Sequence, residues 1–133
     1  MAALTPARAD KFSFGIWTVG NSGRDPFGEA TRAPLDPNES LRRLAALGAF
    51  GISMHDNDLV PIDATPAERD AIVAQFRRTL VDTGMVVSMA TTNLFGHPVL
   101  KDGAFTSNDR AVRRYAIAKR LDQLVIELLM GAR

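Results

Sequence analysis

The stretch FGISMHDND, residues 50–58, decides the fold that the sequence predicts. It places an apolar run, Phe50 to His55, directly before a polar segment of two aspartates and an asparagine. A mostly apolar run of this length, without strict alternation, is typical of a parallel strand that is covered on both faces. We therefore expect a buried strand over 50–55 that ends at a polar loop.

Two further runs of the same kind precede and follow the central one. They are Phe12 to Val19 and Val86 to Thr91, and the starts of the three runs are 38 and 36 residues apart, at positions 12, 50 and 86. This spacing accommodates a strand, a loop and a crossover helix. The chain therefore predicts three strand–helix units in succession.

Helix start and stop signals follow the first two runs. Asp36 and Thr65 each precede a proline and lie three residues before a glutamate, which is the pattern of an N-cap with proline at the first helical position. Gly48 and Gly84 are expected to end these helices. The residues predicted to form their buried stripes are Leu41, Leu44, Ala45 and Leu47 in the first helix, and Ile72, Val73, Phe76 and Leu80 in the second.

A third helix is expected from Ser107 or Asn108 to Met130. Its end, Leu124 to Met130, is apolar on nearly every side, and one short chain offers little surface to cover it. We therefore expect this end to pack against another copy of the chain, as a homo-oligomer, dimer or tetramer.

Alternating strands and helices with short connections predict an α/β fold with a parallel sheet. Three parallel strands leave both sheet edges open, so the sheet is incomplete by itself. We expect a single domain over 1–133, with a flexible arm over 1–10, strand–helix units over 11–119 and the end of the long helix over 120–133.

Composition excludes several classes of function. The chain has 133 residues, 46% of them hydrophobic, a formal net charge of +1 and no cysteine. The balanced charge argues against nucleic acid or an anionic membrane as partner, and the lack of cysteine excludes disulfides and thiolate chemistry. No apolar run is long enough to span a bilayer and no signal peptide is recognisable, so a cytoplasmic protein is expected.

The carboxyl ends of parallel strands are where ligands bind in α/β folds, and this rule selects the candidate site residues. His55 and Asp58 form the best acid–base pair, because a nearby carboxylate fixes the tautomer of an imidazole and favours its protonated form. The alternative is a capped strand end with solvated carboxylates. Trp17 and Phe95 are candidate flat walls for a sugar ring, although aromatic side chains near a strand end are more often part of the core. Thr91 is a candidate hydrogen-bonding group, although a threonine in a strand needs no function.

A metal site is a weaker possibility at the same strand ends. Four side chains of suitable chemistry are His55, Asp56, Asp58 and His97, but their spacing is not diagnostic of any metal. Arg24 and Asp25 are most simply a local ion pair on a turn.

Several ordered segments together resemble the xylose isomerase family of actinobacterial type. They are Phe14 to Gly20, Gly23 to Gly28, His55 to Leu59, Ala90 to Phe95 and Lys101 to Thr106, and the resemblance extends from about Lys11 to Lys119. The tail from Arg120 to Arg133 resembles the extreme C-terminus of the same family.

The resemblance implies both a fold and an activity. The family forms an eight-fold (β/α) barrel of the TIM type, so this chain would hold three of its βα units. It interconverts aldoses and ketoses, D-xylose with D-xylulose and D-glucose with D-fructose, using two divalent cations, Mg²⁺ or Mn²⁺ or Co²⁺, and it assembles as a tetramer. By the same resemblance His55, oriented by Asp58, would assist sugar ring opening. The implied substrate-binding residues are Trp17, Phe95, Thr91 and, reaching into a neighbouring subunit, Phe27.

Two departures from the family pattern bear on function. The middle of the family barrel, which carries the metal ligands, is missing between Lys119 and Arg120, and Asn57 stands where the family commonly has aspartate. No metal ligand of this chain is therefore matched by motif. The alternative to a metal-dependent isomerase is a non-catalytic barrel fragment that assembles with itself or docks onto full-length isomerase subunits.

Overall fold

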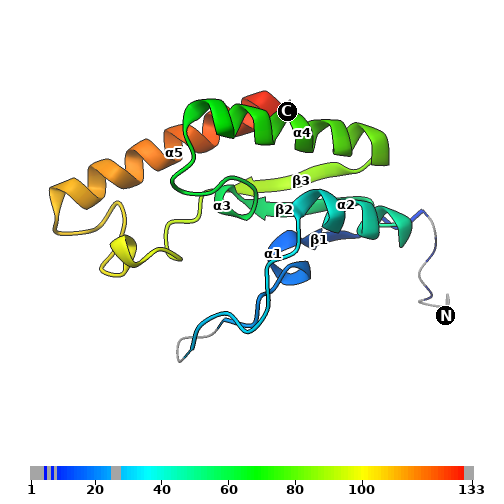
Figure 1. Cartoon of the computed structure of the whole chain (residues 1–133), viewed down its shortest axis with the longest axis horizontal. Helices are drawn as coiled ribbons and strands as arrows, with labels where there is room; N and C mark the ends of the chain where they lie inside the picture. The colour runs from blue at the N-terminus through cyan, green and yellow to red at the C-terminus, as the bar shows by residue number, and fades with distance from the viewer. Residues whose placement is uncertain (1–4, 6, 8, 25–27, 131–133) are drawn as a thin grey trace.

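The structure is a mixed α/β fold with a three-stranded parallel sheet and a long C-terminal helix (Figure 1). It is a computed structural model and describes residues 5, 7, 9–24 and 28–130. The elements in chain order are β1 (Ser13–Gly15), α1 (Ile16–Val19), α2 (Pro37–Ala46), β2 (Gly51–His55), α3 (Asp56–Leu59), α4 (Pro66–Thr83), β3 (Val86–Thr91), the 3₁₀ helix η1 (Pro98–Leu100) and α5 (Arg110–Met130).

The strands lie in the order β1-β2-β3, so β2 is the central strand. Both pairings are parallel, with Ile52 opposite Phe14 on one side and opposite Val87 on the other. A bulge between Ile52 and Ser53 shifts the second register, so that His55 pairs with Thr91 at the carboxyl end. The predicted strands at 50–55 and 86–91 are confirmed.

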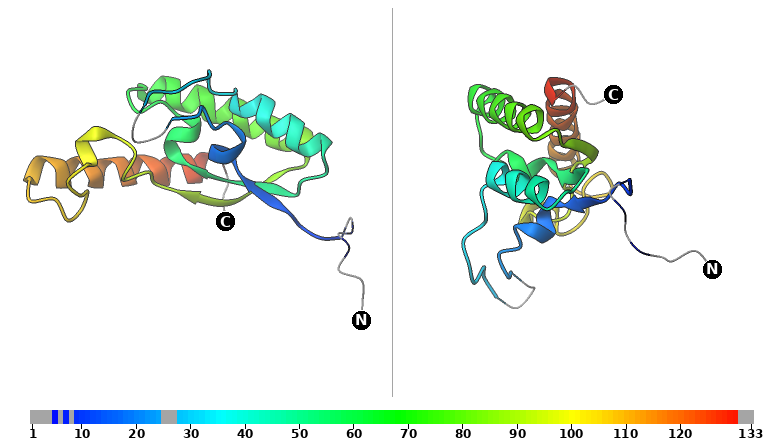
Figure 2. Two further views of the ribbon diagram at one scale, coloured as in Figure 1. Left: turned by 90° about the horizontal axis from the view of Figure 1, so that it is seen from below. Right: turned by 90° about the vertical axis from the view of Figure 1, so that its right-hand side faces the viewer.

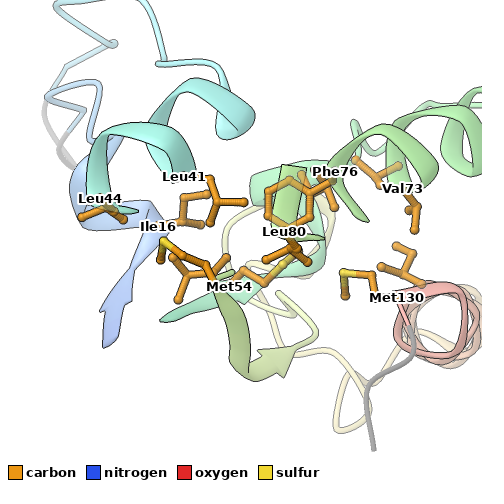
Figure 3. Close-up of a cluster of buried hydrophobic side chains, with 13 residues drawn as sticks. Ile16, Leu41, Leu44, Met54, Val73, Phe76, Leu80 and Met130 are labelled. Atoms are coloured by element: carbon orange, nitrogen blue, oxygen red, sulfur yellow. The ribbon is translucent and has the colours of Figure 1, made fainter. Parts of the chain in front are cut away.

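A single hydrophobic core lies between the sheet and the long helices. Ile52 and Met54 of β2 are fully buried in it, together with side chains from α2, α4 and α5. Figure 3 shows how these side chains converge; those labelled are Ile16, Leu41, Leu44, Met54, Val73, Phe76, Leu80 and Met130. In β3, Val86 and Met89 are exposed, at 38% and 49%.

The first predicted strand is wrong in its second half. Only Ser13–Gly15 pairs with β2, and Ile16–Val19 forms the one-turn helix α1. The hydroxyl of Thr18 donates to the carbonyl of Gly15 at 2.6 Å, and the amide of Gly20 donates to that of Ile16 at 2.9 Å. Ile16 is buried in this turn. The apolar run therefore forms a strand in its first half and a helical turn in its second half, and the apolar pattern alone does not distinguish the two.

The predicted starts of α2 and α4 are confirmed. The carboxylate of Asp36 accepts the amide of Glu39 at 2.9 Å, and the hydroxyl of Thr65 accepts the amide of Glu68 at 3.3 Å. Glu68 in turn accepts from the hydroxyl and the amide of Thr65, and these bonds, the side-chain one foremost, lower the pKa of Glu68. Gly84 ends α4 with a φ of 68°, a left-handed conformation that favours glycine.

Leu47 is not part of the buried stripe that the sequence predicts. It follows α2 as the C-cap and is 84% exposed, whereas Leu41 and Leu44 are buried. The helix ends at Ala46, one residue before the last apolar residue of the predicted stripe, so Leu47 points away from the core.

Helix α5 begins at Arg110, two or three residues after the predicted start, and continues without interruption to Met130. The expected division of the chain between 119 and 120 therefore falls inside one helix. The expectation that the apolar end needs another chain is wrong for Ile126 and Met130, which are buried in this chain's own core. None of the helices in the described ranges is long and apolar enough to cross a membrane.

Candidate functional site

The candidate site begins where β2 passes directly into α3. The backbone amide of His55 donates to Oδ2 of Asp58 at 2.8 Å, and Nδ1 of the imidazole lies 3.2 Å from the same oxygen. Because an ionised carboxylate can only accept, this contact places the proton of a neutral imidazole on Nδ1. Nε2 is then the nitrogen free to accept a proton from a ligand.

Two aromatic rings flank the imidazole of His55. The ring centroid of Trp17 lies 4.5 Å away with the planes tilted by 47°, and that of Phe95 lies 5.6 Å away in an edge-on arrangement at 81°. Trp17 and Phe95 are themselves 37% and 71% exposed. Their exposure places them at the surface of the site rather than in the core.

Gly15 makes room for the indole of Trp17. A Cβ at position 15 would lie 2.6 Å from two ring carbons of Trp17, closer than real contacts allow. The backbone of Gly15 has a φ of −68°, which any residue adopts, so the glycine is required by the close approach of the ring and not by its conformation. Gly15 is not among the residues selected from the sequence, although a glycine at the end of a strand is a signal for close packing.

Thr91 lies beside His55 as its partner in the parallel register of β2 and β3. Paired residues of neighbouring strands project to the same face, so Thr91 belongs to the His55 side of the sheet. Its hydroxyl is 3.5 Å from the carbonyl oxygen of Met54, at the limit of a hydrogen bond, and the residue is half-buried. A ligand that lies over His55 could compete for this hydroxyl.

The position of Phe95 depends on a turn that follows β3. Oδ1 of Asn93 accepts the amides of Phe95 at 3.2 Å and Gly96 at 2.7 Å, which closes an Asx turn around the aromatic residue. The amide of Asn93 is in turn held at 2.8 Å by Oδ1 of Asp56. Asp56, the first residue of α3, therefore positions Phe95 through Asn93, whereas Asp58 contacts His55 directly.

Asp56 also binds the C-terminal helix. Its Oδ2 accepts a hydrogen bond from Nζ of Lys119 in α5, and both side chains are buried. Tyr115 lies one helical turn before Lys119, and its pKa is raised by burial and, second, by the charge of Asp56. Sequence reasoning placed Asp56 among possible metal ligands and gave Lys119 no role, because the two residues are 63 positions apart.

The side chains present do not fit the divalent cations that the resemblance implies. Within the described ranges no group of three histidine, aspartate or glutamate side chains is placed to hold a metal ion. The four candidates are engaged elsewhere: Asp58 with His55, Asp56 with Lys119, and His97 with the amide of Val99 at the start of η1, 3.2 Å away. The described side chains therefore form no site for a divalent cation.

A cavity of about 300 Å³ adjoins the site beyond Trp17 and Asp58, which both line it. Asn21, Asn57 and the fully buried Ser40 add polar groups to its wall. The volume is at the lower end of that found for small-molecule sites. Two predicted residues, Phe27 and Asp25, lie outside the described residues.

The structure thus brings together four of the six residues selected from sequence, His55, Asp58, Trp17 and Phe95, and sets Thr91 beside them. The arrangement offers an oriented base with two exposed aromatic rings beside it. Such a site can hold the apolar face of a ring and move a proton at its edge. No known protein-family model matches the chain.

Proposed function

We propose that this chain binds an aldose against the ring faces of Trp17 and Phe95 and uses His55 to open the sugar ring. The observation that carries the proposal is the imidazole of His55, oriented by Asp58 and in contact with two exposed aromatic rings. Aromatic rings pack against the C–H faces of pyranoses, and an imidazole with one free nitrogen is suited to proton transfer near neutral pH.

Ring opening requires one proton to leave and one to arrive. Nε2 of His55 takes the proton of the anomeric hydroxyl, the bond between the anomeric carbon and the ring oxygen breaks, and a water molecule protonates the ring oxygen. The product is the open-chain aldehyde, and the hydroxide is neutralised by the imidazolium, so nothing is oxidised or reduced. Asp58 stabilises the imidazolium while it exists.

Ring opening is the first half of the aldose–ketose isomerisation that the resemblance to xylose isomerase implies. On that basis we propose D-xylose to D-xylulose as the full reaction, with D-glucose to D-fructose as the second substrate pair, in a cytoplasmic protein built from three units of a TIM-type barrel. The second half, a hydride shift between neighbouring carbons, needs polarised sugar oxygens. In the family Mg²⁺, Mn²⁺ or Co²⁺ supplies that polarisation, and the described residues do not provide ligands for it.

A second candidate function is a non-catalytic barrel fragment that assembles with itself or docks onto a full-length isomerase. The observation that favours it is the three-stranded sheet, whose outer strands β1 and β3 each pair on one side only in the described part of the chain. Parallel sheets normally continue beyond three strands and are covered on both faces.

The interconversion of the anomers of D-xylose, followed by polarimetry, separates the two candidates. We expect the wild type to accelerate it, His55→Ala to abolish the acceleration, and His97→Ala, which changes the chain's other histidine, to leave it intact. Xylulose formation is assayed in parallel with Mg²⁺ or Mn²⁺ added. A wild type that neither accelerates the interconversion nor binds xylose by calorimetry would favour the non-catalytic fragment, and xylulose formation insensitive to His55→Ala would indicate a contaminating host isomerase.

A further inference from the structure

Helix α5 has a second apolar side that the core does not use. One side faces the interior and carries the buried residues Ala116, Gln123, Ile126 and Met130. The other side carries four exposed aliphatic residues, which we call the outer stripe: Ile117 at 52%, Leu121 at 58%, Leu124 at 40% and Leu128 at 77% exposure.

The outer stripe has the spacing of a coiled-coil seam. Its members are separated by steps of four, three and four residues, at positions 117, 121, 124 and 128. Apolar residues at such steps occupy the a and d positions of a heptad, which keeps them on one side of a helix that packs against another helix. Scattered exposed leucines are normal on a protein surface, but four in register on one helix are a partner-binding pattern.

The position of α5 leaves the outer stripe accessible. The helix packs against α4 and the core on its inner side, and its N-terminal half extends beyond the end of the sheet (Figure 2). The stripe lies on the opposite side of the helix from Ile126 and Met130, as 3.6 residues per turn require.

We propose that the outer stripe binds the outer stripe of a second copy of this chain, with the two α5 helices antiparallel. A two-fold axis between Leu121 and Leu124 sets Leu121 opposite Leu124 of the partner subunit. The same axis sets Ile117 opposite Leu128 of the partner subunit, which gives four aliphatic layers from one helix per chain. This pairing is independent of the proposed sugar chemistry.

Charges beside the stripe fit this orientation. With Leu121 and Leu128 at a positions, Arg120 and Glu127 both occupy g positions. In an antiparallel pair g positions face g positions across the interface, and the two-fold axis that aligns the leucines sets Arg120 opposite Glu127 of the partner subunit, twice per dimer. On the other flank Ala118 and Val125 face each other, so the seam is lined by small apolar groups on one side and opposite charges on the other.

A parallel pairing does not have this complementarity. There a g residue faces an e residue of the partner, and Arg120 would meet Val125. Within one chain Arg120 and Glu127 already approach each other at 3.5 Å along the flank of the helix, where both side chains are partly exposed, and Glu127 also accepts from Nε2 of Gln123 at 3.1 Å. The dimer therefore requires Arg120 to exchange this contact for Glu127 of the partner subunit. The charge pattern therefore selects the antiparallel dimer.

The interface is small, so the dimer should be concentration-dependent. Four layers from one helix per chain form an interface smaller than the roughly 1,200–2,000 Å² of specific, stable complexes. We expect sedimentation equilibrium to show a mass that rises from 14.4 kDa towards twice that value as the concentration increases. A range from about 10 μM to about 1 mM covers a weak association of this kind.

Leu121→Asp tests the stripe, and Leu47→Asp is the matched control because Leu47 is an exposed leucine outside α5. We expect Leu121→Asp to weaken association at least about tenfold, because a charge enters two layers of each dimer, and Leu47→Asp to leave it unchanged. Circular dichroism verifies that both variants stay folded.

Charge reversal tests the orientation. Arg120→Glu and Glu127→Arg should each weaken self-association about three- to tenfold, since every interchain pair becomes repulsive. An equimolar mixture of the two variants should restore association, because in the mixed dimer both pairs become opposite in charge again. An effect within one chain cannot be rescued by mixing.

The proposal is overturned if the wild type stays at 14.4 kDa throughout this range. It is equally overturned if Leu47→Asp weakens association as much as Leu121→Asp does, or if the mixture of charge variants associates no better than each variant alone.

Discussion

Two carboxylates on the single turn of α3 have opposite roles. Asp58 contacts His55, three residues away, and the two side chains are 15% and 18% exposed. Asp56 contacts Lys119, 63 residues away, and the two side chains are 7% and 10% exposed between α3 and α5. Residues two positions apart on a helical turn project to different sides, so one short segment serves both the site and the fold.

The two pairs differ in which contacts of the tertiary structure are lost when the pair is broken. The His55–Asp58 pair is local, so its loss leaves the tertiary structure with the same long-range contacts. The Asp56 carboxylate joins three segments: Lys119 in α5, Asn93 after β3 and Asn57 in α3. We therefore expect the first pair to determine activity and the second to determine stability.

Lys119→Met should have the largest effect. It leaves the buried carboxylate of Asp56 without its cation, and removing one partner of a buried pair typically costs about 3–5 kcal/mol. Urea unfolding measures the loss. The double variant Asp56→Asn with Lys119→Met is the control, because it removes both charges while the asparagine oxygen can still accept from Asn93, and it should recover most of the stability. If Lys119→Met had the same free energy of unfolding as the wild type, the Asp56–Lys119 pair would not determine stability.

Asp58→Asn should separate activity from stability. Without the carboxylate the imidazole of His55 loses its orientation and its support when protonated, so anomer interconversion should slow by about 100-fold. The free energy of unfolding should fall by only about 1 kcal/mol, since a single partly exposed hydrogen-bonding group is altered. Urea unfolding and polarimetry on the same preparation check both numbers. If Asp58→Asn lost as much stability as Lys119→Met, the His55–Asp58 pair would determine stability as well, and the two pairs would not differ in role.

Gly15→Ala should produce a smaller, local effect on the site. The added methyl group would lie 2.6 Å from the indole of Trp17, so the ring must leave its present position beside His55. Calorimetry should show xylose affinity reduced about three- to tenfold, roughly 1 kcal/mol. Gly20→Ala is the control, because a Cβ there meets nothing closer than 3.5 Å. Equal affinity in both variants would show that the indole does not contact the sugar.

Tyr115 should report the smallest effect, as a shift in titration. Its pKa lies above the ordinary value of 10.0 because burial, and to a lesser degree Asp56, disfavours the phenolate. The folded chain therefore holds this proton more tightly than the unfolded chain, and the resulting stability is present below pH 10 and is lost as the pH rises above it. Absorbance titration of the single tyrosine should give a raised midpoint that falls, but not fully to 10.0, in Asp56→Asn, since burial is the larger cause. A midpoint at the ordinary value in the wild type would contradict the burial of Tyr115 near Asp56.

Local signals in the sequence predicted much of the fold. The caps at Asp36 and Thr65 set the starts of α2 and α4 because a capping side chain contacts an amide only three residues away. The Asp58–His55 contact was predictable for the same reason. The run at Phe12 to Val19 was misassigned because an apolar run of this length does not distinguish a strand from a buried helical turn.

The long-range contacts could not be predicted from one sequence. Nothing near Lys119 in the chain indicates that it meets Asp56, and nothing near Asp56 indicates that it holds the turn at Asn93. The burial of Ile126 and Met130 likewise depends on α5 packing against α4, which apolar composition alone did not determine.

The chain contains one tryptophan, Trp17, and its ring centroid lies 4.5 Å from that of the imidazole of His55. A protonated imidazole quenches indole fluorescence on contact, so the whole tryptophan emission of this protein comes from a fluorophore that touches the candidate base. Protonation of His55, displacement of the indole and arrival of a ligand on its ring face would each change the emission intensity without any label. The site therefore contains its own optical probe, and stopped-flow mixing could follow events there on the millisecond scale.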